Sequence, residues 1–214
     1  MQSGTAEQQR LEATALAAAR RGWKVFPLQP GGMAPAVRNW HERATTDLDR
    51  IRHCWRTGPF NIGVLPCRSG LLVIELAVPG PKQAAPPDWR MPGVVDGCDV
   101  LAVLADRHRG RYPATTYAAK TPQGHWHLYF AHPRRDCPTA TRGLSGPLGW
   151  LVGLKTTGCY VAAAGSVTAQ GSITVVHDAA PEPLPDWLLH LLPPAEAGQR
   201  CGHRGRIRDA GVTR

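Results

Sequence analysis

The sequence predicts an α+β domain with a mixed or largely antiparallel sheet and flanking helices. Helical patterns at residues 7–21 and 47–55 lie among short apolar strand patterns, whereas residues 115–177 carry strand patterns only. The hydrophobic fraction of 43% is that of a folded chain rather than a disordered one. A length of 214 residues suits one domain with a substantial core.

The first third of the chain predicts two helices and three strands. Residues 7–21 are rich in strong helix formers and end before Gly22, a favourable C-cap. Thr46 and Asp47 precede a second helix, in which apolar residues recur at helical spacing: Leu48, Ile51 and Trp55. Short apolar runs predict strands at residues 23–28, 61–65 and 71–77.

A Pro-rich linker, residues 79–92, separates these elements from the rest of the domain. A helix is predicted near residues 98–108, and Asp96 and Asp99 at its start are explained as capping residues. Strands follow, at residues 115–120, 125–130, 150–154, 159–164 and 172–177. An amphipathic helix at 186–192 closes a domain of residues 1–192, and residues 193–214 are predicted to be a disordered basic tail.

The net charge of +9 is unevenly distributed, since five arginines and one aspartate give residues 200–214 a net charge of +4. A solvated tail and a nonspecific nucleic-acid contact explain this equally well. The six cysteines include no CxxC pair, so neither a zinc ribbon nor a dense disulfide framework is expected, and Cys201 with His203 would make a poor metal site. Without a signal-peptide pattern or a membrane span, we expect a cytoplasmic protein with reduced thiols and no membrane partner.

One acid interrupts the apolar run LLVIELAVPG, residues 71–80. A buried unpaired carboxylate is costly, so Glu75 should face a partner, a metal ion or an open cleft. Side chains two residues apart share a strand face, so we expect Val73, Glu75 and Ala77 to point the same way. In a metal site, Ala77 is where a second carboxylate should stand.

Six sequence blocks occur in an informative order: GWKVFPLQPGGMAPAV, RATTDLDRIRHCW, GPFNIGVLPCRSGLLVIEL, TPQGHWHLYF, GCYVAAAGSV and LPDWLLHLL. Together, over residues 10–192, they resemble the bifunctional DNA primase/polymerase family of the archaeo-eukaryotic primase superfamily. The resemblance implies a palm-like α+β domain that binds nucleotides and a DNA or RNA template and joins nucleotides with Mg²⁺ or Mn²⁺. Paired carboxylates suit this chemistry because two divalent ions prefer oxygen ligands.

The family pattern has two acids separated by one residue on an apolar strand, a histidine on another strand and an acid on a third. Glu75 matches the first acid, while Ala77 and Gly153 stand where the other two are expected. No acid lies between Asp136 and Asp178, so no shift of alignment restores the third. Glu75 would then be a weak remnant metal ligand.

By the same resemblance, nucleotide contacts fall to His127, Lys155 and Ser166. His125 should share a strand face with His127, so these two histidines and Glu75 could alternatively form a His₂-carboxylate metal site. The family usually has lysine at Met33, whose replacement would weaken phosphate binding.

Side chains outside the family motif could also contact a ligand. The candidates for phosphate or template contact are Arg38, Arg68, Lys120 and His125, although ordinary solvated charges would look the same. Three tryptophans could stack on bases: Trp40, Trp55 and Trp126. Trp55 is better explained as core, because it lies on a helical apolar stripe.

Three functions remain open at this point. The first is a protein that binds nucleotide or nucleic acid with lost or severely weakened nucleotidyl transfer, needing no metal. The second is an active metal-dependent, template-directed nucleotidyltransferase that uses Glu75, and the third is a noncatalytic interaction scaffold. The sequence contains no P-loop pattern, so a helicase or other replication partner would be a separate chain.

Overall fold

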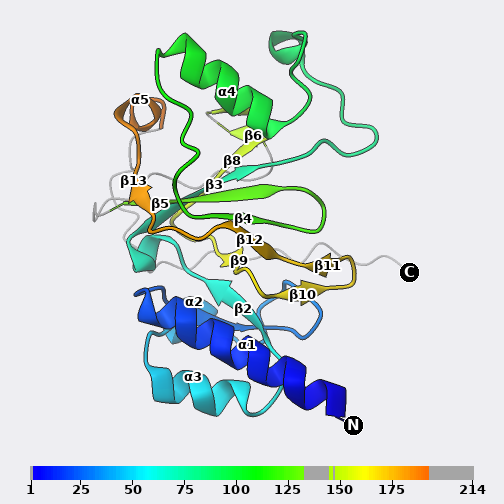
Figure 1. The fold of residues 1–214 in the computed structure, drawn as a ribbon, viewed down its shortest axis with the longest axis vertical. Coiled ribbons are helices and arrows are strands. Elements are labelled where there is room, and N and C mark those ends of the chain that lie inside the picture. Colours follow the sequence, from blue (N-terminus) through cyan, green and yellow to red (C-terminus); the bar gives the residue numbers. More distant parts are fainter. Residues whose placement is uncertain (1, 133–144, 147, 193–214) are drawn as a thin grey trace.

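The computed structural model describes residues 2–132, 145–146 and 148–192. The helices are α1 (Gln2–Arg20), α2 (Trp40–Arg43), α3 (Leu48–Trp55), α4 (Gly97–Arg107) and α5 (Asp186–Leu189), with 3₁₀ turns at Cys67–Ser69 and Pro87–Trp89. Figure 1 shows α1, α2 and α3 at one end of the molecule, the sheets in the middle, and α4 and α5 at the other end. Helices combined with antiparallel sheets confirm the α+β prediction.

The largest sheet has the order β12-β4-β5-β3-β8, and its neighbouring strands are antiparallel. Its strands are β12 (Thr174–His177), β4 (Ala118–Lys120), β5 (Trp126–Ala131), β3 (Leu71–Leu76) and β8 (Val152–Lys155). A short strand, β13 (Glu182–Pro183), adds to β5 in parallel. The long strand β3 therefore lies between β5 and β8, so its side chains have cross-strand neighbours on both sides.

A second sheet has the order β1-β2-β9 and is also antiparallel. It consists of β1 (Val25–Leu28), β2 (Asn61–Val64) and β9 (Val161–Ala162). Two hairpins complete the described strands: β10 (Val167–Thr168) with β11 (Gly171–Ser172), and β6 (Ser145–Gly146) with β7 (Gly149–Trp150).

Alternation along β3 divides the core into two clusters. Leu71 and Val73 pack with α1, α3 and the second sheet. Leu72, Ile74 and Leu76 pack on the opposite face, together with apolar residues of α4 and β8. Both faces of β3 are thus covered, which explains why its sequence is an almost continuous apolar run.

The predicted helix signals are confirmed at three termini. Gly22 follows α1 with a φ of 83°, a left-handed conformation that glycine adopts readily. The Asp47 carboxylate accepts hydrogen bonds from the backbone N–H groups of Asp49 and Arg50 at the start of α3. Asp96 and Asp99 form a capping box at the start of α4.

Two sequence expectations are corrected. Ala77 does not continue the face of Glu75: β3 ends at Leu76, and Ala77 packs in the cluster on the α4 side. Its backbone N–H donates to the Leu151 carbonyl, and its carbonyl accepts from the N–H of Gly97. The expectation of reduced thiols is wrong for Cys67, which is disulfide-bonded.

Several elements differ in length from the sequence prediction or were absent from it. The last helix is shorter than predicted, and α2 and the β10–β11 hairpin were not predicted. The basic tail, with Cys201 and His203, lies outside the described residues. Among the helices that are described, none has the length and apolar character needed to cross a bilayer.

Candidate nucleotide site

Three neighbouring strands bring the predicted site residues together. In the antiparallel register, Glu75 on β3 lies opposite His127 on β5 and opposite Gly153 on β8. Directly opposed side chains are close enough to interact, so His127 is placed beside the carboxylate. Lys155 lies two residues from Gly153 and therefore on the same face of β8.

The Glu75 carboxylate has a cation in direct contact. Lys155 Nζ lies 2.8 Å from Glu75 Oε2, a charge-assisted hydrogen-bond distance. His127 Nε2 lies 3.6 Å from Oε1, which is too long for a good hydrogen bond. The side chain of Glu75 is 14% exposed and that of Lys155 is 21% exposed, so this ion pair is largely buried. The expected partner of Glu75 is therefore an ammonium group of the chain itself.

The electrostatics of the site follow from this contact. Burial on its own would raise the pKa of Glu75, but the interactions with His127 and Lys155 outweigh it and lower the pKa to about 2. Glu75 is consequently ionised at neutral pH and balanced by Lys155. Burial lowers the pKa of His125, which the charge of Glu75 only partly opposes.

Glu75, His127 and Lys155 line an open pocket of about 410 Å³. The remaining lining residues are Met33, Thr121, Gln123, His125, Tyr160, Val161 and Ala162. The pocket thus has hydrogen-bonding groups on the β5 side and apolar groups on the β9 side. The region around β4 and β5 also provides Thr121 and Gln123, which the sequence analysis did not single out, although both belong to the segment before HWHLYF.

Tyr160 is a further lining residue that was not predicted. Its hydroxyl donates a hydrogen bond to the backbone carbonyl of Met33, at 2.9 Å. This contact ties the loop after β1 to the segment that leads into β9. Met33 itself also lines the pocket.

The other predicted contact residues lie elsewhere. The Ser166 hydroxyl is buried and accepts a hydrogen bond from the Ile62 N–H, so it positions β2 and does not line the pocket. Arg68 donates to the His41 carbonyl, and Lys120 lies over the Trp126 ring. Arg38 is exposed. These contacts give the predicted ligand roles of Ser166, Arg68 and Lys120 no support.

Two of the three tryptophans are engaged inside the protein. Trp55 is 1% exposed and belongs to the core, as its position on the apolar stripe predicts. Trp40 packs against the rings of Phe26 and Tyr160. Its half-buried side chain is packed on these rings and is not among the lining residues of the pocket, so it offers no open stacking platform there.

The residues of the pocket do not fit a pair of divalent metal ions. Glu75 is the one carboxylate among the lining residues, and Lys155 already neutralises it. Over the ranges 2–132, 145–146 and 148–192, no three His, Cys, Asp or Glu side chains are grouped as metal ligands would be. His125, His127 and Glu75 line the same pocket but do not form such a group.

Comparison with protein families gives a match over most of the chain. The family model described as bifunctional DNA primase/polymerase, N-terminal, matches residues 15–187. No curated protein matches the chain. The matched range includes β3, β5 and β8, the three strands that build the pocket. The chain therefore belongs to the bifunctional DNA primase/polymerase N-terminal family, and its described fold is a primase/polymerase-like domain.

Proposed function

We propose that this protein binds nucleotides and nucleic acid but has lost, or retains only weakly, the transfer of nucleotides. One observation carries the proposal: Lys155 Nζ lies 2.8 Å from Glu75 Oε2, so the carboxylate that matches the first metal-binding acid of the family pattern is paired with a lysine. Two further acids of the family pattern are replaced by Ala77 and Gly153. Family membership supports nucleic acid and nucleotides as the partner classes.

Nucleotidyl transfer in this family is typically metal-dependent. Two divalent ions clamp both the attacking and the leaving oxygen, which a single ammonium group cannot do. Lys155 brings one positive charge, and Glu75 offsets it. The pair supplies neither the net charge nor the bridging geometry that a two-ion site provides, so we expect the transition state to receive little stabilisation.

Nucleotide binding requires hydrogen-bond donors but not a pair of metal ions. An ammonium group has three N–H donors, so Lys155 can contact Glu75 and a phosphate oxygen together. The side chains of Thr121, Gln123 and His127 provide further hydrogen-bonding groups around the pocket. A volume of about 410 Å³ falls in the range of small-molecule sites. The pocket can therefore accept a nucleotide through its own donors, without a metal bridge.

The main alternative is an active enzyme. It is favoured by the low pKa of Glu75, about 2, which keeps this carboxylate ionised at neutral pH. Such an enzyme would need Glu75 to exchange Lys155 for a metal ion and would need another carboxylate. The scaffold alternative has no specific contact in its favour.

The first test measures labelled nucleotide incorporation on single-stranded and primed DNA with Mg²⁺ or Mn²⁺, using the wild type and Glu75→Ala. We expect no product from either folded protein. In parallel, binding of labelled deoxythymidine triphosphate should persist in excess chelator and weaken in Lys155→Met. Product that is formed by the wild type and lost in Glu75→Ala would instead establish the active alternative. Absence of both nucleotide and DNA binding would favour the scaffold.

A further inference from the structure

A groove with a volume of about 370 Å³ lies between α1 and β12. We call it the α1 groove. Small side chains of α1 line it on one side, among them Ala13 and Ala17, and Val175 of β12 lines it on the other. None of its lining residues belongs to the pocket that contains Glu75. The α1 groove is therefore a separate place for a ligand.

The strand that borders the groove, β12, is exposed on both of its faces. Val175 is 45% exposed and Val176 is 50% exposed, and neighbouring side chains of a strand point to opposite faces. Within residues 2–132, 145–146 and 148–192, the one strand that pairs with β12 is β4. The other edge of β12 is therefore open, and an open apolar edge is a template for pairing with another chain.

The residue before β12 shows that this edge can pair. The Ile173 N–H donates to the Ser166 carbonyl at 2.9 Å, and the Ile173 carbonyl accepts from the Gly165 N–H at 2.7 Å. Alternate residues of a strand direct their N–H and C=O groups to the same edge, so those of Val175 should point away from β4, as those of Ile173 do. No backbone partner continues this outer ladder at Val175 within the described part of the chain. The next position of the ladder is thus vacant.

Two arginines lie at the ends of the α1 groove and differ in their partners. Arg21 Nη2 lies 2.6 Å from Asp178 Oδ1, so its charge is balanced. Arg10 Nη1 donates to the Gly165 carbonyl at 2.8 Å, and Arg10 has no ion pair among the described residues. A guanidinium group has five N–H donors, so Arg10 retains donors for a carboxylate.

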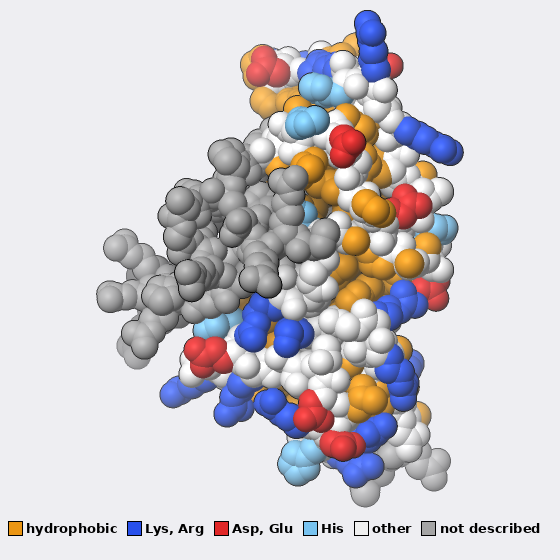
Figure 2. Space-filling model, turned by 90° about the vertical axis from the view of Figure 1, so that its left-hand side faces the viewer, with side chains coloured by type: hydrophobic (Ala, Val, Ile, Leu, Met, Phe, Trp, Pro, Cys, Tyr) orange, Lys and Arg blue, Asp and Glu red, His pale blue; other side chains and the backbone are white. Residues whose placement is uncertain are grey.

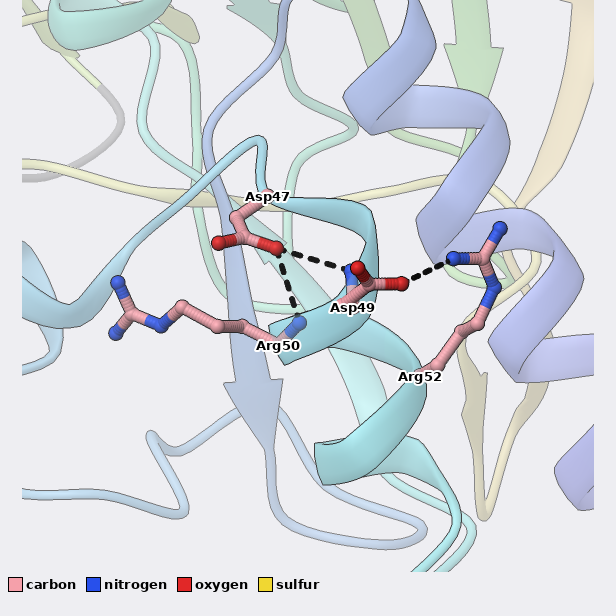
Figure 3. Close-up of polar contacts among 4 residues, drawn as sticks. All are labelled: Asp47, Asp49, Arg50 and Arg52. Atoms are coloured by element: carbon pink, nitrogen blue, oxygen red, sulfur yellow. Dashed lines mark hydrogen bonds and ion pairs between the residues drawn. The ribbon is translucent and has the colours of Figure 1, made fainter.

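The surroundings of α1 are also positively charged. Figure 2 shows Lys and Arg side chains gathered over the end of the molecule at which Figure 1 places α1, α2 and α3, with fewer acids between them. Some of these cations are paired: on α3, Arg52 Nη1 lies 2.7 Å from Asp49 Oδ1 (Figure 3). Because Arg10 is not paired in this way, the ligand that best complements the groove carries a negative charge.

The length of the groove limits the size of its ligand. Arg10 and Arg21 are eleven positions apart, which corresponds to about 16 Å of helix. An extended chain covers about 3.3 Å per residue, so about five residues span this distance. The small side chains of Ala13 and Ala17 leave room beside α1 for the side chains of such a segment.

We infer that the α1 groove binds an extended acidic peptide segment of a partner protein, which adds to the open edge of β12 as a further strand. The backbone of Val175 pairs with the peptide backbone, and Arg10 binds a carboxylate of the peptide. Small apolar side chains of the peptide face α1. A peptide complements the backbone N–H and C=O groups of a strand edge, which a nucleic acid does not. A second copy of the chain is disfavoured by the net charge of +9.

The test follows backbone amide signals of the isotope-labelled protein by NMR while an unlabelled peptide is added. The probe is an acetylated peptide of about nine residues, with one glutamate followed by alternating valine and alanine. A second probe has glutamine in place of the glutamate. We expect saturable shifts at the amides of β12 and of the groove side of α1, and slower hydrogen exchange of the Val175 amide when the peptide is bound.

Four variants measure the contribution of each wall. Ala17→Leu fills the groove and Val175→Pro removes the N–H of the open edge, where proline is tolerated, so each should weaken binding about tenfold. Ala6→Leu is the control for added volume, because Ala6 is exposed on α1 and does not line the groove. Arg10→Met should weaken the glutamate probe about threefold and leave the glutamine probe unchanged, whereas Arg20→Met should alter neither. A dispersed amide spectrum shows that each variant is folded.

Several outcomes would overturn the inference. One is the absence of saturable shifts at about 1 mM peptide, and another is an equal loss of binding in Ala6→Leu. Equal binding of the two probes would remove the role of Arg10. The same amide shifts on addition of oligothymidylate would assign the groove to nucleic acid. Concentration-dependent broadening of the β12 amides without any peptide would assign the edge to a second copy of the chain.

Discussion

Two pockets of the structure differ in how their charges are balanced. One contains Glu75 and is lined by Tyr160, and the other is lined by Phe26. In the nucleotide pocket, Lys155 and Glu75 neutralise each other at 2.8 Å. The second pocket, which we call the α3 pocket, lies between β1 and α3 and is lined by Arg43, Asp49 and Arg50. Neither Arg43 nor Arg50 forms an ion pair among the described residues, because Asp47 caps the helix and Asp49 pairs with Arg52. Unpaired positive charge therefore lies at the α3 pocket, whereas the charges of Glu75 and Lys155 cancel in the other pocket.

The largest loss of stability is expected when the cation of the Glu75 pocket, Lys155, is removed. Lys155→Met keeps most of the aliphatic stem but leaves a largely buried carboxylate unpaired, so we expect a loss of about 3 kcal/mol in the free energy of unfolding. Urea denaturation at neutral pH measures it. Lys120→Met is the control, because Lys120 is exposed and lies outside the ion pair. The double variant Glu75→Gln, Lys155→Met should recover part of the loss, whereas strictly additive losses would contradict coupling between the two residues.

The pH dependence of unfolding tests the same ion pair through the carboxylate of Glu75. The folded-state pKa of Glu75 is about 2, below its ordinary value of 4.5. Its stabilising contribution is therefore present above pH 4.5 and is lost as the pH falls through about 2. Glu75→Gln lacks this component, so the difference in unfolding free energy between wild type and variant should shrink by about 2 to 3 kcal/mol over that window. A difference that stays constant from pH 5 down to about 2 would contradict the assigned pKa.

Phe26, Trp40 and Tyr160 form an aromatic cluster, and Gly63 pairs with Phe26 across β1 and β2. A Cβ at this position would come within 2.4 Å of the Phe26 ring, and Trp40 and Tyr160 limit how far that ring can move. We expect Gly63→Ala to destabilise the protein by about 2 kcal/mol through overpacking. Near-ultraviolet circular dichroism and urea denaturation report the change. Gly32→Ala, where a Cβ would make only ordinary contacts, should have a much smaller effect.

The smallest expected effect concerns the start of α3. Asp47→Ala removes the side-chain acceptor for the N–H groups of Asp49 and Arg50, which should cost about 1 kcal/mol of stability. It also removes a negative charge near the α3 pocket, so oligonucleotide binding should be unchanged or slightly tighter. Asp47→Asn retains a capping side chain and separates the two effects. Markedly weaker DNA binding in both variants would argue against the assigned distribution of charge.

Much of the fold could be predicted because local signals and packing agree. The stripe of Leu48, Ile51 and Trp55, together with the cap at Asp47, predicts α3, and the structure confirms both the cap and the burial of Ile51 and Trp55. The apolar run of β3 is likewise explained by clusters on both of its faces. In contrast, α2 has only four residues and no buried side chain, so it leaves no periodic pattern in the sequence.

The site was predicted only in part. The blocks around Glu75, His127 and Lys155 predicted its members, but not that Lys155 on β8 would form a diagonal contact with Glu75 on the neighbouring strand β3. Such contacts depend on strand order and register, which sequence spacing does not determine. Ala77 was wrongly predicted to share the strand face of Glu75. Two-residue periodicity holds only while a strand continues, and β3 ends at Leu76. The α3 pocket was not predicted as a site, although most of its lining residues fall in the block RATTDLDRIRHCW, because its walls from β1, the α2 region and α3 meet only in the folded chain.

The register of β3 also has a consequence for how the protein becomes folded. Glu75 pairs with His127 on one side and with Gly153 on the other, so its surroundings are completed by strands about 50 and 80 residues further along the chain. Contacts of such long sequence separation form late, because the chain entropy of closing the loops is lost first. During synthesis, a ribosome-bound chain that has exposed β3 but not β8 carries Glu75 without its lysine. Until β8 is added, β3 is an unprotected sheet edge, so chains that stall before Lys155 should be especially prone to aggregation.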